Sequence, residues 1–571
     1  MAKNIYDNSN LAESYSGITT PLTFSFARRV YQDVYKSFCQ IMGVSKKSIK
    51  ANDDMFPEMV VFIGHRMYYN LINWYRLISL LPGYKLNRRF LEKMLGVEKE
   101  HNYTNQQRYS FWQKYFLDFP NLVWQVFKII FLFLFMGGLI RNFNRKFDII
   151  FARSSKLDLS SLDLKKLRAV YISLVKNLTR RWRVPIANDL AVMISTGVAD
   201  KLFKKWLKQD DVYEYLKMSS HASLISLDPG LEILAISEKI KNDTTLSELF
   251  IKNDTNKIWL QLENEYKNTK VAEMIFYYLK KFGSRSPNEL KLESITLEED
   301  PKIFINCLKK IVSSPNANNL SKKTNIKEQT KSIKNKNISW VKKIVLNIII
   351  KWSVNSIRRR EETRFKRTLI FGFARKIFLQ MGRLFVKLNL MKSHRDIFYL
   401  KTGEIFSIID QKMSKDDVDK LIQNRKVTIK KWRGIELPRR IETDKTIKEQ
   451  EQEFLIKTDI EVERTDLFGV IASKAKQSHI DGEALVLTDF DPVADYSNKI
   501  LVTRQTDPGW SIVFPLIKGL VVERGGMLSH AAIVARELGI PCLIGATNAT
   551  SLVKDNSKVI LNFSTGQISY E

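Results

Sequence analysis

Cysteine is scarce in this sequence: the 571 residues contain three, Cys39, Cys307 and Cys542, and no CxxC pair. Three isolated thiols exclude the disulfide framework of a small secreted domain, and they lack the spacing of a zinc cluster. Residues 1–16 also lack the apolar stretch of a secretory signal. We therefore expect a cytoplasmic protein.

Motifs for nucleotides and metals are missing as well. Neither GxxxxGK[ST] nor GxGxxG occurs, so a self-contained nucleotide-binding loop of either kind is not expected. The histidines are scattered, none of them in an HExxH pattern, and an acidic run near Asp300 is typical of a solvated face. We predict no metal site, and we expect structural or surface roles for His65, His101, His221, His394, His479, Glu289, Glu293, Glu298 and Glu299.

Long hydrophobic runs are almost absent. Residues 122–140 approach the roughly 20 apolar residues of a membrane span, but Gln125 and Lys128 interrupt them. The uninterrupted part, 129–140, has the length of a buried core helix or an interfacial helix, and Gly137 and Gly138 weaken its end. A core helix is the preferred interpretation, and no membrane span is expected.

Positive charge, by contrast, is abundant. The formal net charge is +31, which would attract nucleic acid, a membrane surface or a phosphorylated substrate. Lysine is scattered among Asn and Ile, as in 331–336, and this pattern also fits a coding bias. Because no recognised nucleic-acid motif accompanies the charge, we expect no nucleic-acid partner.

The length predicts two or three domains, because domains usually have about 100 to 200 residues. Helical periodicity dominates the first part, as in 24–42 and 66–81, and returns in a second block over 340–390. Between them, the polar stretch 313–337 is typical of a linker or loop. We expect a mainly helical domain over 1–440.

The composition changes after a predicted linker at 441–466. Short β-rich runs, separated by Gly, Asp and Asn turn signals, then surround one strong helix. We expect a small α/β domain over 467–571, and hence an α+β fold class. The predicted strands are 483–487, 500–503, 519–523, 541–544, 559–561 and 567–570.

The stretch 519–545 carries the most chemical information, because it reads strand, glycine turn, helix, strand. Gly525 and Gly526 can adopt positive φ and let the backbone approach a ligand, and Ser529 is a favoured N-cap residue. Apolar residues at helical spacing then predict one buried face, made of Ala531, Val534, Ala535 and Leu538. His530 falls in the first turn of this helix.

A helix N-terminus offers unpaired N–H groups and a positive dipole end, which favour a phosphoryl group and disfavour imidazolium. A neutral imidazole nitrogen is a nucleophile, so His530 is a candidate phosphoryl carrier. A lone histidine at such a position more often only helps to cap a helix.

The wider motif GG-x-x-SH-x-x-x-x-AR-x-x-GIP resembles the phosphohistidine signature of phosphoenolpyruvate-utilising enzymes, in which the histidine after serine is phosphorylated. The preceding TDPGW, 506–510, resembles the rifamycin-phosphotransferase-like branch, and 10–31, 64–89, 282–297 and 359–400 resemble the helical central domain of these enzymes. The resemblance implies a phosphohistidine swivelling domain with catalytic His530, and it implies phosphate positioning by Gly525, Gly526, Ser529 and Arg536.

The sequence departs from this family in three ways. The usual ATP-grasp and phosphoenolpyruvate-binding domains are not expected, because the similarity starts near Met1 and ends with the small domain, and 469–482 replaces the usual domain entrance. The resemblance therefore implies an incomplete phosphotransferase component, dikinase-like or rifamycin-phosphotransferase-like. A separate ATP-grasp protein would supply the phosphoryl group from ATP with magnesium, and the chain itself would bind no cofactor.

The acceptor stays open. The aromatic-rich stretch 66–76 could stack a planar acceptor, although core packing is the preferred interpretation. Pyruvate with water, a drug-like hydroxyl or no small molecule at all are the alternatives. A catalytically degenerate binding or regulatory protein that retains the fold is the alternative to the whole interpretation.

Overall fold

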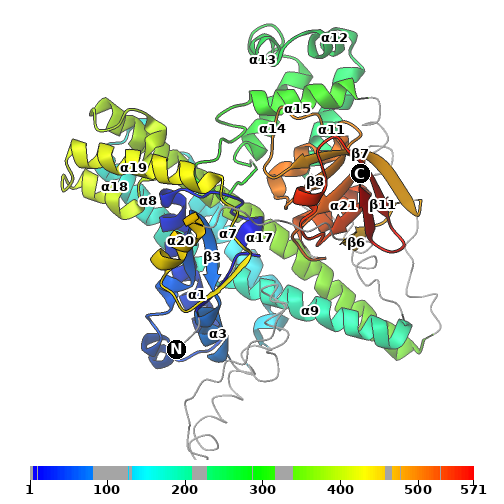
Figure 1. Cartoon of the computed structure of the whole chain (residues 1–571), viewed down its shortest axis with the longest axis horizontal. Helices are drawn as coiled ribbons and strands as arrows, with labels where there is room; N and C mark the ends of the chain where they lie inside the picture. The colour runs from blue at the N-terminus through cyan, green and yellow to red at the C-terminus, as the bar shows by residue number, and fades with distance from the viewer. Residues whose placement is uncertain are drawn as a thin grey trace, which may run out of the picture. The chain divides into compact units, whose positions relative to one another are not determined.

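The computed structural model describes residues 4–9, 11–81, 127, 131–208, 228–285, 287–314, 338–456, 466–475, 477–527 and 529–570. The chain divides into two compact units that interleave along the sequence. Unit 1 comprises Met1–Gly197, Leu290–Glu293 and Ile370–Thr458, and unit 2 comprises Val198–Glu289, Ser294–Leu369 and Asp459–Glu571. Helices dominate and a small α/β body ends the chain (Figure 1), which confirms the predicted α+β class.

Unit 1 contains helices around a small antiparallel sheet with the strand order β2-β3-β1-β4. Helix α1, Pro21–Ile41, begins with proline at its first position, where the missing N–H costs nothing. Its bounds confirm the helix predicted over 24–42. The strands are β1 Asn4–Asp7, β2 Val60–Ile63, β3 Arg66–Asn70 and β4 Arg440–Thr443.

The prediction of one helix over 66–81 is wrong in its first part, because β3 precedes helix α3, Leu71–Ser79. Strands β2 and β3 form a hairpin in which Ile63 faces Arg66. The two loop residues, Gly64 and His65, both have positive φ, +52° and +57°, as a tight primed hairpin turn requires. Helical periodicity alone did not reveal this turn.

The predicted linker 441–466 is also wrong in its first half. Strand β4 pairs antiparallel with β1, Ile5 facing Glu442, and helix α20, Ile447–Ile456, follows it. The sequence of β4 resembles a linker because its pairing partner, β1, is more than 400 positions away, and such a distant partner leaves no local pattern in the sequence. Residues 457–465 lie outside the described part.

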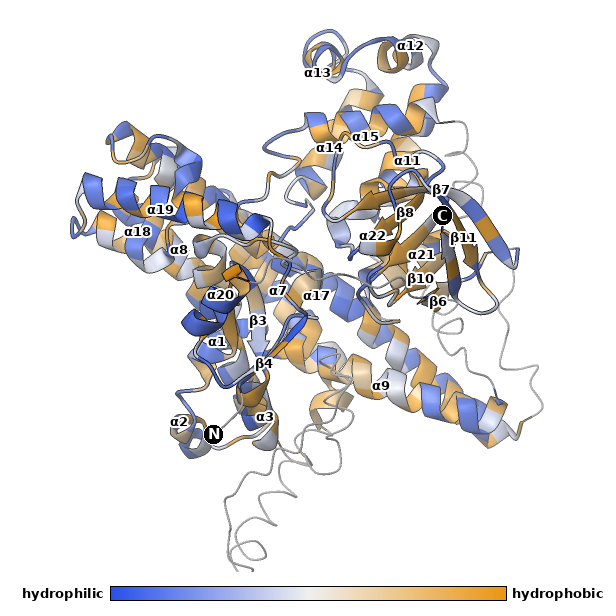
Figure 2. Ribbon diagram, in the orientation of Figure 1, coloured by the Kyte–Doolittle hydropathy of each residue, from blue (hydrophilic) through white to orange (hydrophobic). Residues whose placement is uncertain are grey.

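The remaining described helices of unit 1 carry apolar and polar stripes (Figure 2). Helix α17, Trp340–Lys387, confirms the second helical block and contributes residues to both units. Residues 122–126 and 128–130 of the run 122–140 lie outside the described part. In the described remainder, Phe131, Leu134 and Phe135 are more than half exposed, so the preferred interpretation as a buried core helix is wrong there. None of the described helices is long and apolar enough to cross a membrane. The others are α2 Lys46–Ala51, α7 Met136–Ser155, α8 Leu164–Leu178, α18 Thr402–Ile409, α19 Lys415–Arg433 and α9 Arg183–Leu207, which continues into unit 2 from Val198 onward.

Unit 2 combines five described helices between 228 and 313 with an eight-stranded sheet, order β5-β12-β11-β7-β8-β9-β10-β6, in which β5 is Leu467–Phe468 and β6 is Val470–Ser473. Strands β7 to β10 are parallel to one another, and the flanking pairs are antiparallel. All six predicted strands are present: β7 His479–Leu487, β8 Ile500–Thr503, β9 Gly519–Val522, β10 Cys542–Ile544, β11 Lys558–Asn562 and β12 Gln567–Tyr570. The helices are α11 Asp228–Lys241, α12 Thr244–Lys252, α13 Thr255–Glu263, α14 Lys270–Phe282 and α15 Lys302–Ser313.

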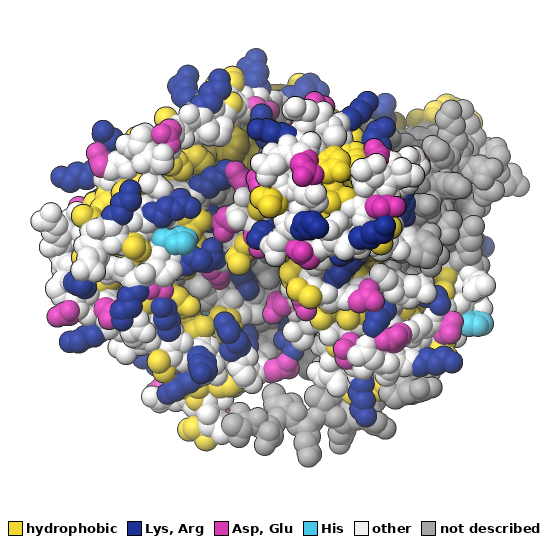
Figure 3. All heavy atoms as spheres, turned by 90° about the horizontal axis from the view of Figure 1, so that it is seen from above, with side chains coloured by type: hydrophobic (Ala, Val, Ile, Leu, Met, Phe, Trp, Pro, Cys, Tyr) yellow, Lys and Arg dark blue, Asp and Glu magenta, His cyan; other side chains and the backbone are white. Residues whose placement is uncertain are grey.

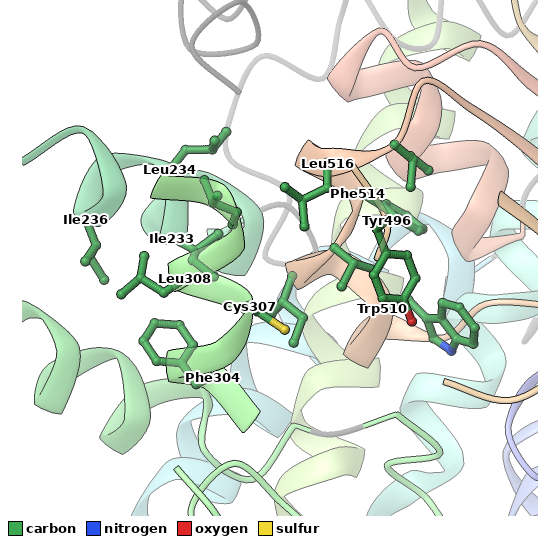
Figure 4. Close-up of a cluster of buried hydrophobic side chains, with 14 of the residues drawn as sticks. Ile233, Leu234, Ile236, Phe304, Cys307, Leu308, Tyr496, Trp510, Phe514 and Leu516 are labelled. Atoms are coloured by element: carbon green, nitrogen blue, oxygen red, sulfur yellow. The ribbon is translucent and has the colours of Figure 1, made fainter. Parts of the chain in front are cut away.

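The helices of unit 2 and its α/β body share one apolar core (Figure 4). Side chains of α11 and α15 meet aromatic and aliphatic side chains of the loops that follow β7 and β8. Burial of this kind contributes about 25 cal/mol per Å² of apolar surface. The core includes Ile233, Leu234, Phe304, Leu308, Tyr496, Trp510, Phe514 and Leu516.

Candidate functional site

Helix α21, His530–Leu538, starts after a glycine turn that follows β9. Gly525 has φ +122°, a conformation that side chains rarely adopt, so glycine is required there. The Ser529 Oγ accepts a bond from the Ala532 N–H at 3.4 Å, and Gly539 ends the helix in the left-handed conformation. The predicted turn and N-cap are confirmed.

Helix α21 is more deeply enclosed than an amphipathic pattern predicts. Its expected face, Ala531, Val534, Ala535 and Leu538, is buried, and so are Ala532 and Ile533. His530 itself is 2% exposed. The candidate nucleophile is therefore out of reach of solvent in this arrangement.

The His530 ring has one weak polar contact. Its Nε2 lies 3.4 Å from the Ser511 Oγ, while that hydroxyl donates to the Pro508 carbonyl at 2.8 Å. In the tautomer with the proton on Nε2, the ring donates to this hydroxyl. Nδ1 is buried without a hydrogen-bond partner among the described residues, so in that tautomer it carries a free lone pair.

Burial lowers the pKa of His530 well below the ordinary value for histidine, and the positive charges of Arg364 and Arg285 lower it further. Removing a cation from water is costly, and two neighbouring cations add repulsion. The ring is therefore neutral at pH 7. A neutral imidazole is the form in which histidine attacks phosphorus.

Arg285, which follows α14, is unusual because it is 4% exposed and its Nε and Nη1 have no hydrogen-bond partner. Its guanidinium lies 4.6 Å from the centre of the Phe365 ring. The burial lowers the pKa of Arg285, an effect that the nearby Glu289 charge opposes. An incompletely paired buried cation is costly, and its free N–H groups suit an oxyanion.

Glu289 belongs to the same cluster. It is 6% exposed, its Oε1 accepts from the Thr368 hydroxyl at 2.6 Å, and its Oε2 has no partner. The expectation that this acidic run is a solvated face is wrong for Glu289, and also for the half-buried Glu293, which accepts from Thr20 and Thr23 in unit 1. Glu298 and Glu299 are exposed, as predicted.

The TDPGW segment positions Ser511. The Asp507 Oδ1 accepts from the Gly509 N–H at 2.8 Å and so caps the 3-10 helix Pro508–Ile512, in which Ser511 lies. The Asp507 Oδ2 accepts from the Asn288 N–H, next to Glu289. This one carboxylate therefore connects the histidine's neighbour to the segment that carries Arg285 and Glu289.

Arg536, expected to position phosphate, contacts backbone carbonyls in this arrangement. Its Nε donates to the Ala472 carbonyl at 2.8 Å, and its Nη2 donates to the Met527 carbonyl. Ala472 belongs to β6, Val470–Ser473, so the divergent stretch 469–482 begins with an edge strand against β10, and its last residues belong to β7. A phosphate contact of Arg536, like those of Gly525, Gly526 and Ser529, stays a prediction.

The other histidines lie apart from this cluster where they are described. His65 is in the β2–β3 turn, where burial lowers its pKa to about 4. His394 begins a 3-10 helix and His479 begins β7. His101 and His221 lie outside the described residues. Among the described residues, no group of side chains could hold a metal ion.

Comparisons with known proteins agree with this geometry. Residues 496–566 match the mobile domain of PEP-utilising enzymes, and residues 186–361 match the fourth domain of rifampicin phosphotransferase. Residues 496–566 are thus similar to a mobile domain of the phosphoenolpyruvate-utilising class. Of the helical region, residues 186–361 are similar to a domain of rifampicin phosphotransferase.

Individual relatives support both matches. A rifampicin phosphotransferase of Bacillus cereus is 24% identical over 410 residues, 67% of this chain and 44% of the relative. A prodigiosin synthesizing transferase of Serratia marcescens is 26% identical over 358 residues, 61% of this chain and 39% of the relative. A phosphoenolpyruvate synthase of Aquifex aeolicus is 42% identical over 90 residues, 16% of this chain and 10% of the relative. The chain spans less than half the length of these relatives.

Proposed function

We propose that this chain is a phosphotransferase component whose His530 carries a phosphoryl group between a donor and an acceptor. The observation that carries the proposal is a neutral histidine at the start of α21 in the electrostatic field of two arginines. Desolvation keeps the ring nucleophilic, and the cations favour the phosphoryl group that the ring would hold.

Two transfers make up the reaction. In the first, a ring nitrogen of His530 attacks a phosphorus atom of the donor, so that a P–N bond forms and the P–O bond to the leaving group breaks. In the second, an acceptor hydroxyl attacks the phosphorus of phosphohistidine and loses its proton to water, so that a P–O bond forms, the P–N bond breaks and its electron pair returns to the ring nitrogen. Both steps depend on positioning and charge stabilisation more than on covalent chemistry by the protein.

His530 has to be uncovered between these steps, because it is 2% exposed in the described arrangement. We assign this arrangement to a closed, acceptor-side state, in which the α/β body packs on the helices of unit 2. A donor reaches the histidine after the two have separated. Such swings of whole domains occur in microseconds to milliseconds.

Arg285 and Arg364 then have a role in the closed state. Phosphorylation converts a neutral ring into a group with about −1.5 to −2 charges, and Arg285 offers two N–H positions without a partner. Glu289 keeps that guanidinium in place through its charge. We propose that the closed state binds phosphohistidine more tightly than histidine.

The donor in this proposal is ATP with magnesium, bound by an ATP-grasp protein on a separate polypeptide, and the reaction takes place in the cytoplasm. The acceptor is a small molecule with a hydroxyl group, held on the helical side. A degenerate binding protein is the alternative, and the similarity to several phosphotransferases does not favour it.

The test is transfer of labelled phosphate. The full-length chain is incubated with a candidate ATP-grasp protein, magnesium and ATP that carries labelled β- and γ-phosphates. We expect label that survives alkali and is lost in acid, as phosphohistidine is, and none in His530→Ala. Equal labelling of His530→Ala would refute the role of His530.

A further inference from the structure

Unit 1 contains a cavity of about 760 Å³ that is not part of the phosphohistidine site. Its wall includes a stripe on α1, in which Gln32, Asp33, Lys36, Ser37 and Gln40 follow Arg29 at helical spacing. The facing stripe on α7 consists of Leu139, Asn142, Phe143 and Lys146. Helices usually meet through apolar stripes, so a polar stripe on α1 that faces Asn142 and Lys146 of α7 across a cavity suits an occupant other than side chains.

The charge of this cavity has one dominant sign. Six cations and one carboxylate, Asp33, line it, for a net charge of +5. The cations come from the two stripes, from the last turn of α8, from the segment that joins α8 to α9 and from the first residue of α9, so elements far apart in sequence converge on one space. They are Arg29, Lys36, Lys146, Lys176, Arg181 and Arg183.

Two of the six cations have acidic neighbours. The Arg29 Nε lies 3.4 Å from an Asp33 oxygen, and Lys36 forms an ion pair with Asp53. No described carboxylate lies within ion-pair distance of Lys146, Lys176, Arg181 or Arg183. Elsewhere, on the face shown in Figure 3, basic side chains are interspersed with acidic ones.

We propose that this cavity binds a small polyphosphate anion. Each phosphate group carries about one to two negative charges at neutral pH, so two or three groups would balance the four cations without an acidic partner. The cavity volume is within the range of small-molecule sites, about 300–1,000 Å³. Its cations surround one space between helices, which favours a compact ligand over a nucleic-acid duplex, which needs an extended basic strip.

The lining of the cavity includes one aromatic residue, Phe143. It is 6% exposed and lies edge to face with Trp182, which is outside the lining, at 5.4 Å between ring centres. A planar base could pack against Phe143, whereas inorganic triphosphate would leave this side chain without a contact. Polyphosphate is the chemistry that both ligands share, and the experiment separates them.

The test is calorimetric titration of the full-length His530→Ala chain with inorganic tripolyphosphate, and separately with ATP. We expect binding of one ligand per chain, weakened about tenfold or more in Lys146→Gln/Arg183→Gln, since one charge-assisted contact alone is worth about a factor of ten. The control, Lys46→Gln/Lys47→Gln, removes the same charge from exposed positions outside the cavity lining. Circular dichroism checks that both variants are folded.

The outcomes separate clearly. Selective weakening in the cavity variant supports the proposal, and tighter binding of ATP than of tripolyphosphate identifies the ligand as a nucleotide. Equal weakening in both variants, or no binding by the parent chain, overturns it. Tighter binding of a double-stranded oligonucleotide, lost in the same cavity variant, also overturns it in favour of nucleic acid.

Discussion

The glycine turn before His530 allows a sharp test with two adjacent residues. Gly525 has φ +122°, a backbone conformation that only glycine adopts without strain. Gly526 has an ordinary φ, and a Cβ added there would meet no atom within 4 Å. Gly525→Ala should therefore strain the entry to α21, whereas Gly526→Ala is its matched control.

The magnitude follows from the backbone conformations. An alanine held in a sparsely populated φ/ψ region costs about 1–3 kcal/mol. An alanine at a compatible position removes freedom from the unfolded chain, which stabilises the fold by about 0.4–1 kcal/mol. The two variants should therefore differ by roughly 1.5–4 kcal/mol in local stability.

Hydrogen exchange measured by mass spectrometry suits this comparison, because it reports local opening in a chain of several parts. Peptides from β9 and α21 should exchange about ten- to several-hundredfold faster in Gly525→Ala than in Gly526→Ala, at about 1.4 kcal/mol per factor of ten. Peptides of unit 1 should not change. Equal exchange of the two variants would refute the assigned turn geometry.

Three further predictions concern charge and packing. Arg285→Met should raise the pKa of His530, because it removes a cation that disfavours imidazolium, and Arg285→Lys should not. NMR titration of labelled histidine measures both variants. An unchanged pKa in Arg285→Met would exclude an electrostatic interaction between Arg285 and His530. Because the pKa of His530 is lower in the folded chain than in the unfolded chain, the stability of unit 2 is highest above the unfolded pKa and falls as the pH falls below it. The free energy of unfolding should drop by up to about 1.4 kcal/mol per pH unit below about 6.5, which faster hydrogen exchange would report. His530→Gln should remove this pH dependence. Gly64→Ala should destabilise unit 1 by about 1–3 kcal/mol in thermal melts, because Gly64 has φ +52° and an added Cβ would lie 2.7 Å from the Leu437 side chain. Gly434→Ala is the control and should not destabilise the unit, since a Cβ added there meets no atom within 4 Å.

Much of the α/β body could be predicted because its signals are local. Glycine and asparagine turns delimit short β-rich runs, and β8 and β12 have the predicted bounds. The Ser529 cap and the helix after it follow from short-range rules in the same way. For the same reason, the sequence alone was enough to place His530 at the start of α21.

The rest depends on contacts between distant residues. Strand β4 exists because β1 pairs with it, and Ser511 matters because a turn brings it to His530. Arg285 lies in a stretch that resembles the family, but only burial distinguishes it from the chain's many other arginines. Glu289 was assigned to a solvated run for the same reason, since sequence spacing does not reveal which carboxylate of a group is enclosed.

The central claim, that His530 carries the phosphoryl group, is tested most directly by peptide mass spectrometry at mildly alkaline pH, where phosphohistidine survives. The full-length chain is treated with ATP, magnesium and an ATP-grasp protein known to phosphorylate the mobile domain of an intact relative. We predict one phosphoryl group on the peptide that contains His530. An unmodified peptide, or a phosphoryl group on another residue, would contradict the claim.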